Sequence, residues 1–148
     1  DGHEKRNSPT TSTISSGDSP NHGNFITLSS EPYDWRSPQN NNLWQGVSGV
    51  NNPCPPGYRL PTIQEWEAES KSWISRNATG AFMSPLKLTV AGYRDDGIGS
   101  IWSERSFGFY WSSTVDGSIS MYFVFDNNNA TVYSCRRAFG YCVRCIKD

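Results

Sequence analysis

One helical stretch followed by strand patterns constrains the fold of this chain more than any other feature. In GYRLPTIQEWEAESKSWI, Thr62 and Glu65 form a capping box just before apolar residues at helical spacing. This pattern predicts a helix over residues 63–76. The following segment LKLTVAGYR (residues 86–94) alternates like a half-buried strand. The chain is therefore expected to combine one main helix with β-structure.

The last forty or so residues read as short strands joined by tight polar turns. FGFYWSST, ISMYFVF and TVYSCRR are separated by VDGS and DNNNA, and AFG and YCVRCIKD continue the pattern to the end, as in a meander. Alternate side chains of a strand share a face. We expect the core to contain one face of ISMYFVF, formed by Ile119, Met121, Phe123 and Phe125. Four further aromatic residues are expected to join it: Trp66, Trp73, Tyr110 and Trp111.

The first part of the chain is polar. Residues 1–23 are rich in Ser, Thr, Pro and Gly, so we expect an extended loop or linker ahead of a domain over residues 24–148. Between Phe25 and Gly49, isolated aromatic residues separated by turn formers predict irregular loops whose rings plug the core. A length of 148 residues suits one domain.

Charge and cysteine content exclude several classes of protein. The net charge is −1, which provides no broad basic field for nucleic acid. No apolar run approaches the roughly 20 residues of a membrane span, and we expect any export signal to have been removed. Four cysteines, without two CxxC pairs or a nearby histidine, favour disulfides over zinc.

Four motifs in order, CPPGYRLPT, AGYR, FYWSST and YCVRCIKD, resemble the FISUMP family (the Fibrobacter succinogenes major paralogous domain) over residues 33–148. That resemblance implies an α+β, C-type-lectin-like fold, with one main helix packed on short twisted antiparallel β-sheets and with long loops. It also implies an extracellular or cell-surface location and a disulfide between Cys54 and Cys145, which would stabilise the fold by roughly 4 kcal/mol.

The chain departs from the family pattern in two ways. Cys135 and Cys142 are additional, and we expect them to bridge across the AFG turn, with two unbridged thiols as the alternative. Related domains also begin with a further strand that pairs with the C-terminal strand. We expect that strand upstream of Asp1 in a longer polypeptide; the alternative is a strand donated by a neighbouring protomer.

Enzymatic and metal chemistry are not favoured by the residues. RLPTIQEW also resembles formylglycine-generating oxidases, but these need a reactive cysteine pair upstream of the terminal Arg-Cys element, and no cysteine lies between Cys54 and Cys135. We expect no catalytic residues and no cofactor. Calcium remains an alternative, although the signatures of calcium-dependent lectins are missing. The carboxylate and amide side chains that could ligate it are Asp95, Asp96, Asp116, Asp126, Asn127, Asn128 and Asn129.

Aromatic and arginine side chains concentrate in the terminal meander. Such residues offer large contact area at low entropic cost. The predicted ligand-binding set is Tyr122, Asn127, Asn128, Tyr133, Arg136, Arg137, Phe139 and Tyr141, and an ordinary solvated face is the alternative. Some domains resembling this one are variable proteins of diversity-generating retroelements, which would place varied positions within Ser118–Tyr141. Asn77 and Asn129 begin weak glycosylation sequons.

The leading hypothesis is a non-enzymatic binding or adhesion module of a bacterial surface protein or phage fibre that recognises a protein or glycan. The runner-up is a structural subunit of an extracellular filament, assembled by subunit contacts or strand addition. An oxidase comes third.

Overall fold

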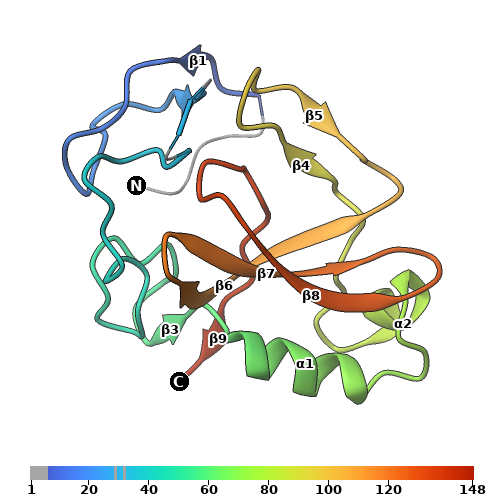
Figure 1. The fold of residues 1–148 in the computed structure, drawn as a ribbon. Helices are drawn as coiled ribbons and strands as arrows, with labels where there is room; N and C mark the ends of the chain where they lie inside the picture. Colours follow the sequence, from blue (N-terminus) through green and yellow to red (C-terminus); the bar gives the residue numbers. More distant parts are fainter. Residues whose placement is uncertain (1–6, 29, 32) are drawn as a thin grey trace.

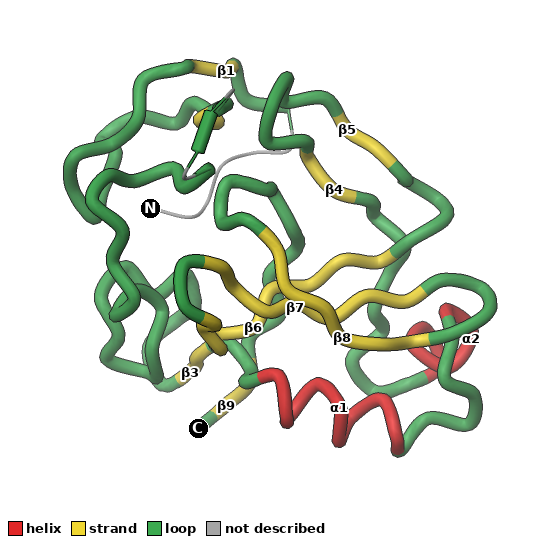
Figure 2. The backbone as a smooth tube through the Cα atoms, viewed as in Figure 1, coloured by secondary structure: helices red, strands yellow, loops and turns green. Residues whose placement is uncertain are grey.

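The computed structural model describes residues 7–28, 30–31 and 33–148 and shows a mixed α+β fold (Figure 1). Its elements in chain order are β1 (Thr10–Thr11), β2 (Phe25–Ile26), β3 (Tyr58–Arg59), α1 (Ile63–Lys71), α2 (Ala78–Met83), β4 (Tyr93–Arg94), β5 (Ile101–Trp102), β6 (Gly108–Asp116), β7 (Ile119–Phe125), β8 (Ala130–Cys135) and β9 (Ile146–Lys147). Long loops connect them, above all before β3 (Figure 2).

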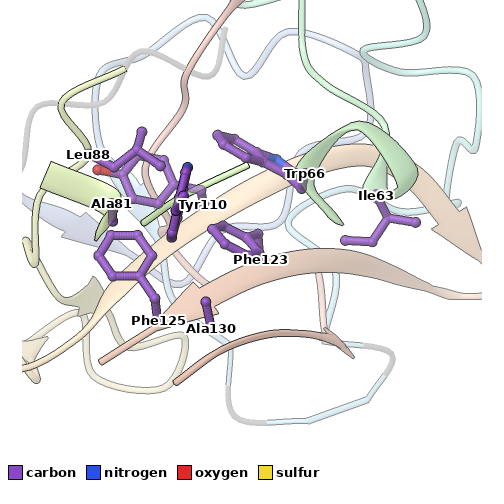
Figure 3. Close-up of a cluster of buried hydrophobic side chains, with 9 residues drawn as sticks. Ile63, Trp66, Ala81, Leu88, Tyr110, Phe123, Phe125 and Ala130 are labelled. Atoms are coloured by element: carbon purple, nitrogen blue, oxygen red, sulfur yellow. The ribbon is translucent and has the colours of Figure 1, made fainter. Parts of the chain in front are cut away.

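The centre of the fold is the antiparallel meander β6-β7-β8, with α1 packed along one of its faces (Figure 1). Aromatic rings join helix to sheet. Trp66 stacks on Phe123 with centroids 5.2 Å apart (Figure 3). Trp73 meets Phe125 edge-on, with centroids 5.9 Å apart. Phe123 and Phe125 are almost completely buried, and Met121 packs against the same cluster, as predicted. Ile119 is half-buried at the far end of the strand.

The predicted capping box opens α1. The Thr62 hydroxyl accepts from the Glu65 N–H, and the Glu65 carboxylate accepts from the Thr62 N–H at 2.7 Å. Arg59 holds the same carboxylate through two bonds of 2.8 Å and donates to Asp148 at 2.7 Å. The Arg59 guanidinium lowers the pKa of Glu65 to about 2. This network joins the start of the helix to the end of the chain.

The helix ends at Lys71, so the prediction of helix as far as residue 76 was wrong. Ser72 closes it, because both its N–H and its hydroxyl donate to the Glu69 carbonyl. Trp73 still reaches the core, with its indole N–H on the Glu69 carboxylate at 2.9 Å. Ile74, expected on the buried face of the helix, is 82% exposed. The chain leaves helical geometry so that Trp73 can turn inward.

Helix α2 was not expected from the sequence. Asn77 caps it by accepting from the Gly80 N–H, so a segment expected to stop one helix begins another. Gly80 lies inside α2, where a Cβ would collide with the Ser75 carbonyl and lie 3.1 Å from the Trp73 Cβ. Close packing, rather than a turn, explains this glycine.

The strand predicted over residues 86–94 was also wrong over most of its length, since strand pairing is confined to its last three residues: Gly92 bridges to Gly108, and Tyr93 and Arg94 pair with β5. Lys87 has a φ of 52°, which interrupts an extended run. The Leu88 N–H donates to the Ala81 carbonyl at 3.2 Å, and the Thr89 N–H donates to the Tyr110 hydroxyl at 2.9 Å. The backbone N–H groups of Leu88 and Thr89 therefore bond to a helix and a side chain instead of a strand.

After β8 the chain leaves the meander and crosses to its opposite edge. Cys142 forms a parallel bridge with Tyr110 of β6, and Gly140 forms an antiparallel bridge with Arg94 of β4. β9 then pairs with β3. The expectation that the C-terminal residues simply continue the meander was wrong, because their hydrogen bonds connect β6 to β4 and β3.

The crossing separates the two additional cysteines. A disulfide joins Cys54 and Cys145, whose Cα atoms are 5.7 Å apart. Cys135 lies in β8 and Cys142 beside β6, so β7 and β6 intervene and the two are about 14 Å apart across the sheet. A disulfide needs Cα atoms within roughly 7 Å. The predicted Cys135–Cys142 bridge is therefore wrong, and these residues are half-buried thiols.

The polar N-terminal segment, within the described residues 7–23, contacts the rest of the chain. β1 pairs with β2 in parallel, Arg94 donates to the Ser8 hydroxyl at 2.8 Å, and Asp18 pairs with Arg36 at 2.7 Å. Residues 1–6 of the predicted loop or linker lie outside the described residues, and the division at residue 23 stays a prediction. In the part of the chain that is described, no helix is long and apolar enough to cross a membrane.

Candidate aromatic binding face

The face of the meander turned away from α1 carries aromatic side chains, because strand alternation directs a second set of rings to this side. Rings from β4, from the segment before β6 and from the crossing residues 139–141 join them. We call the whole set the outer aromatic face: Tyr93, Trp102, Phe107, Phe109, Tyr122, Tyr133, Phe139 and Tyr141.

Tyr141 lies at the centre of the outer aromatic face. Its ring centroid is 4.5 Å from that of Trp111, 4.8 Å from that of Tyr122 and 5.1 Å from that of Phe109. Burial raises the pKa of the Tyr141 hydroxyl above its usual range, so this group stays neutral. Trp111 is buried as predicted, but it lies under Tyr141 and not against the helix. The rings therefore hold one another in fixed positions.

The margin of the outer aromatic face is open to solvent. Tyr133 is 58% exposed and stands opposite Tyr122 in the β7–β8 register. Trp102 is 51% exposed and stands opposite Tyr93 in the β4–β5 register, which places the two on one side of that pair. Exposed aromatic side chains that adjoin other rings are typical of surfaces that bind a protein or another ligand.

Arg136 borders the outer aromatic face. Its guanidinium lies 4.2 Å from the ring centroid of Tyr33 and 5.3 Å from that of Phe139. Asp96, whose side chain is 5% exposed, pairs with it at 3.4 Å, while the Arg136 side chain is 42% exposed. Burial raises the pKa of Asp96, and Arg136 opposes that rise. A cation held against two rings is well placed for contact with a partner.

Arg137 does not belong to this face, although it was predicted to be there. Its side chain is 9% exposed and lies 3.6 Å from Asp34. It also donates to the Asn41 amide oxygen at 2.6 Å and to the Gly117 carbonyl at 3.0 Å. The side chain points between the loop of residues 34–45 and the meander, because alternate residues of an extended segment point to opposite sides.

The asparagines of the predicted ligand-binding set lie elsewhere. Asn127 and Asn128 are exposed in the β7–β8 turn, where the Asp126 carboxylate accepts from the Asn128 N–H at 2.8 Å. The turn is five residues along β7 from Tyr122, so about 17 Å separates it from the centre of the aromatic face. The sequon residue Asn129 is in the same turn, and Asn77 caps α2. The structure therefore divides the predicted set.

Beside Arg137, a two-lobed cleft separates the loop of residues 34–45 from the meander and the crossing segment. The lobes have volumes of about 90 Å³ and about 60 Å³ and share Trp35, Trp44, Trp111 and Arg137. The loop is tied to the meander by Gln45, whose amide donates to the Ser113 carbonyl at 2.6 Å. We call this feature the tryptophan cleft.

Within residues 7–28, 30–31 and 33–148, no group of three or more His, Cys, Asp and Glu side chains could hold an ion. Asp95 and Asp126, two of the calcium candidates, each accept backbone N–H groups of their own turns.

Sequence reasoning missed several members of the outer aromatic face. Tyr93, Trp102, Phe107 and Phe109 come from segments ahead of the predicted site. The alternation in FGFYW, with Phe107, Phe109 and Trp111 on one side, already contained part of the signal. The contribution of β4 and β5 follows from two bridges, between Arg94 and Gly140 and between Gly92 and Gly108.

Comparisons with family models, with curated proteins and with solved structures found no match to this chain.

Proposed function

We propose that the chain is a non-enzymatic binding module of an extracellular or cell-surface protein that contacts a protein or glycan through the outer aromatic face. The observation that carries this proposal is the exposure of Tyr133 at the margin of a layer of contacting rings, together with that of Trp102, which stands opposite Tyr93 in the β4–β5 register. As part of the same proposal, the fold is the C-type-lectin-like fold of the FISUMP family.

The energetics of contact favour this face. Tyr122 and Tyr141 are held by neighbouring rings, so these side chains lose little conformational entropy when a ligand covers them. Tyrosine, tryptophan and arginine are the side chains that most often dominate binding energy. Arg136 supplies the cation at the border. The Cys54–Cys145 disulfide is consistent with an oxidising location outside the cell.

The test compares two exposed alanine substitutions on arrays of glycans and extracellular proteins. Tyr133→Ala should weaken binding to any hit about tenfold or more, because an exposed tyrosine at a hot spot supplies roughly 2 kcal/mol. Ile74→Ala is the matched control, since Ile74 is 82% exposed on the turn between α1 and α2. Equal binding by both variants would reject the outer aromatic face as the contact surface.

A second candidate function is self-assembly, as a structural subunit of an extracellular filament. Ile74, Phe82 and Met83 are exposed together around the α1–α2 turn, at 82%, 59% and 59%. A hollow of about 240 Å³ adjoins Ile74 and Met83. Two separate apolar surfaces on one molecule allow head-to-tail contacts that propagate.

Electron microscopy and sedimentation velocity test this second candidate. Ile74→Ala combined with Met83→Ala should abolish any polymer while leaving ligand binding by the outer aromatic face unchanged. A domain that stays monomeric at high concentration, with wild-type residues, would reject assembly.

A further inference from the structure

We infer that the tryptophan cleft is a second binding site, which takes a neutral oligosaccharide. The cleft adjoins the outer aromatic face, since Phe139 and Tyr141 line its first lobe, but the exposed side chains that carry the proposed function, Tyr133 and Trp102, lie outside it. Its walls, its unpaired hydrogen-bond donors and its balance of charge each contribute to the inference.

The walls of the tryptophan cleft are aromatic. Trp35, Trp44 and Trp111 line both lobes, and Tyr141 closes one of them. Small-molecule sites are typically concave and mostly apolar, with a few polar groups that orient the ligand. A lobe of about 90 Å³ is several times the space that one water needs. The C–H faces of a sugar ring match such walls.

Two donors on residues that line the cleft lack acceptors. Trp44 Nε1 and Arg137 Nε are buried, and within the described part of the chain neither has a hydrogen-bond partner. A buried N–H without a partner has lost its hydrogen bonds to water, and an incoming acceptor oxygen would replace them. Because both nitrogens are covered, the ligand reaches them when the loop of residues 34–45 moves slightly outward.

The backbone at Trp44 is strained. Its φ is 61°, a conformation that bulky side chains rarely adopt, and a bond from the Trp44 N–H to the Val50 carbonyl at 2.9 Å holds it there. Strain of this kind persists where the surrounding structure enforces it, and it concentrates at functional sites. Here its effect is to hold the indole against the cleft.

The charges of the cleft select the class of ligand. The Arg137 cation lies 3.6 Å from the buried Asp34 carboxylate, so the pair offers little net charge to an anion. Further acceptors are at hand, since Asp34 and Asn40 line the second lobe. A ligand with apolar ring faces and several hydroxyl groups meets both the walls and the polar atoms. Those properties belong to a neutral sugar.

The experiment follows the six indole N–H signals of the protein by NMR. The probes are cellotetraose, maltotetraose, chitotetraose and mannotetraose, with one sulfated and one sialylated oligosaccharide as the anionic comparison. On binding, the Trp44 signal should move to the frequency of a hydrogen-bonded indole. The signals of Trp66 and Trp73 should stay in place, because these indoles already donate to the Trp111 carbonyl and the Glu69 carboxylate.

Two variants decide where binding occurs. Trp44→Phe identifies the signal, keeps an aromatic wall and removes the donor, so affinity should fall about tenfold. Ile74→Ala, on the exposed α1–α2 turn, is the control and should leave sugar binding unchanged. A sugar that shifts the Trp102 signal alone, or whose effect on the Trp44 signal is lost in Tyr133→Ala, would lie on the outer face and overturn this inference.

The remaining outcomes also decide the matter. Failure of every neutral oligosaccharide at millimolar concentration, or tighter binding of the anionic ones, overturns the ligand class assigned here. Wild-type affinity in Trp44→Phe overturns the role of the unpaired donor. The outer aromatic face is judged separately, by the loss of array binding in Tyr133→Ala, whereas the tryptophan cleft is judged by the Trp44 signal and by Trp44→Phe.

Discussion

Removal of the Cys54–Cys145 disulfide should destabilise the protein by about 4–5 kcal/mol. The bond spans a sequence separation of 91 residues. The loop-closure relation for a crosslink of that length gives an entropy near 15 cal/mol/K, or about 4.6 kcal/mol at 25 °C. A domain of 148 residues has a total stability of roughly 7–20 kcal/mol, so the loss is a large share of it.

The perturbation is the double variant Cys54→Ala with Cys145→Ala, unfolded in urea and followed by tryptophan fluorescence. The unfolding free energies extrapolated to water should be compared, not the urea concentrations at the midpoints. Removing a crosslink expands the unfolded chain, which makes the unfolding free energy depend more steeply on urea concentration. Wild type in the presence of a reductant is the matched control and should unfold like the variant.

A loss below about 1 kcal/mol would refute the reasoning, because the constraint on the unfolded chain would then be negligible. Wild type that shows four reactive thiols before reduction would refute the bond itself.

Three further predictions concern local chemistry. Glu65→Gln should destabilise the protein by no more than about 1 kcal/mol at pH 7, since the carboxylate is 39% exposed and solvent screens it. The pKa of Glu65 is about 2 in the folded protein against 4.5 ordinarily, so the difference in stability between wild type and variant should shrink as the pH falls from 4.5 and vanish near 2. Urea titrations at each pH measure this difference. Gly108→Ala should cost about 1–3 kcal/mol by calorimetry because its Cβ would overlap the Phe125 ring, whereas Gly23→Ala, with open space around it, should change stability by less than about 0.5 kcal/mol. Burial raises the pKa of Cys135 to about 12, so iodoacetamide at pH 8 should label it slowly in the native protein and quickly in urea, and equal rates would contradict the burial.

The capping box shows how much of the fold is local. Thr62 and Glu65 are three residues apart, and both of their hydrogen bonds form within one helical turn. The inward positions of Phe123 and Phe125 follow from strand alternation in the same way. Such features could be predicted because their cause lies within a few neighbouring residues.

The predictions that failed concern features whose cause lies in distant parts of the chain. The helix ends early because Trp73 must reach rings of β7, and Lys87 breaks a strand pattern beside α2. The Cys135–Cys142 bridge failed because sequence spacing says nothing about which edge of a sheet a segment joins. Each depends on contacts between segments far apart in the chain.

By itself, the sequence determined one main helix with its N-terminal cap, an antiparallel meander with a buried aromatic face, and a chain without a basic field or a long apolar run. Only the tertiary structure decided that the crossing segment runs back beside β6. That crossing places Tyr141 at the centre of the outer aromatic face and directs Arg137 into the tryptophan cleft. The physical reason is that local periodicity fixes which way a side chain points along its own strand, while its neighbours across the sheet depend on the path of the whole backbone.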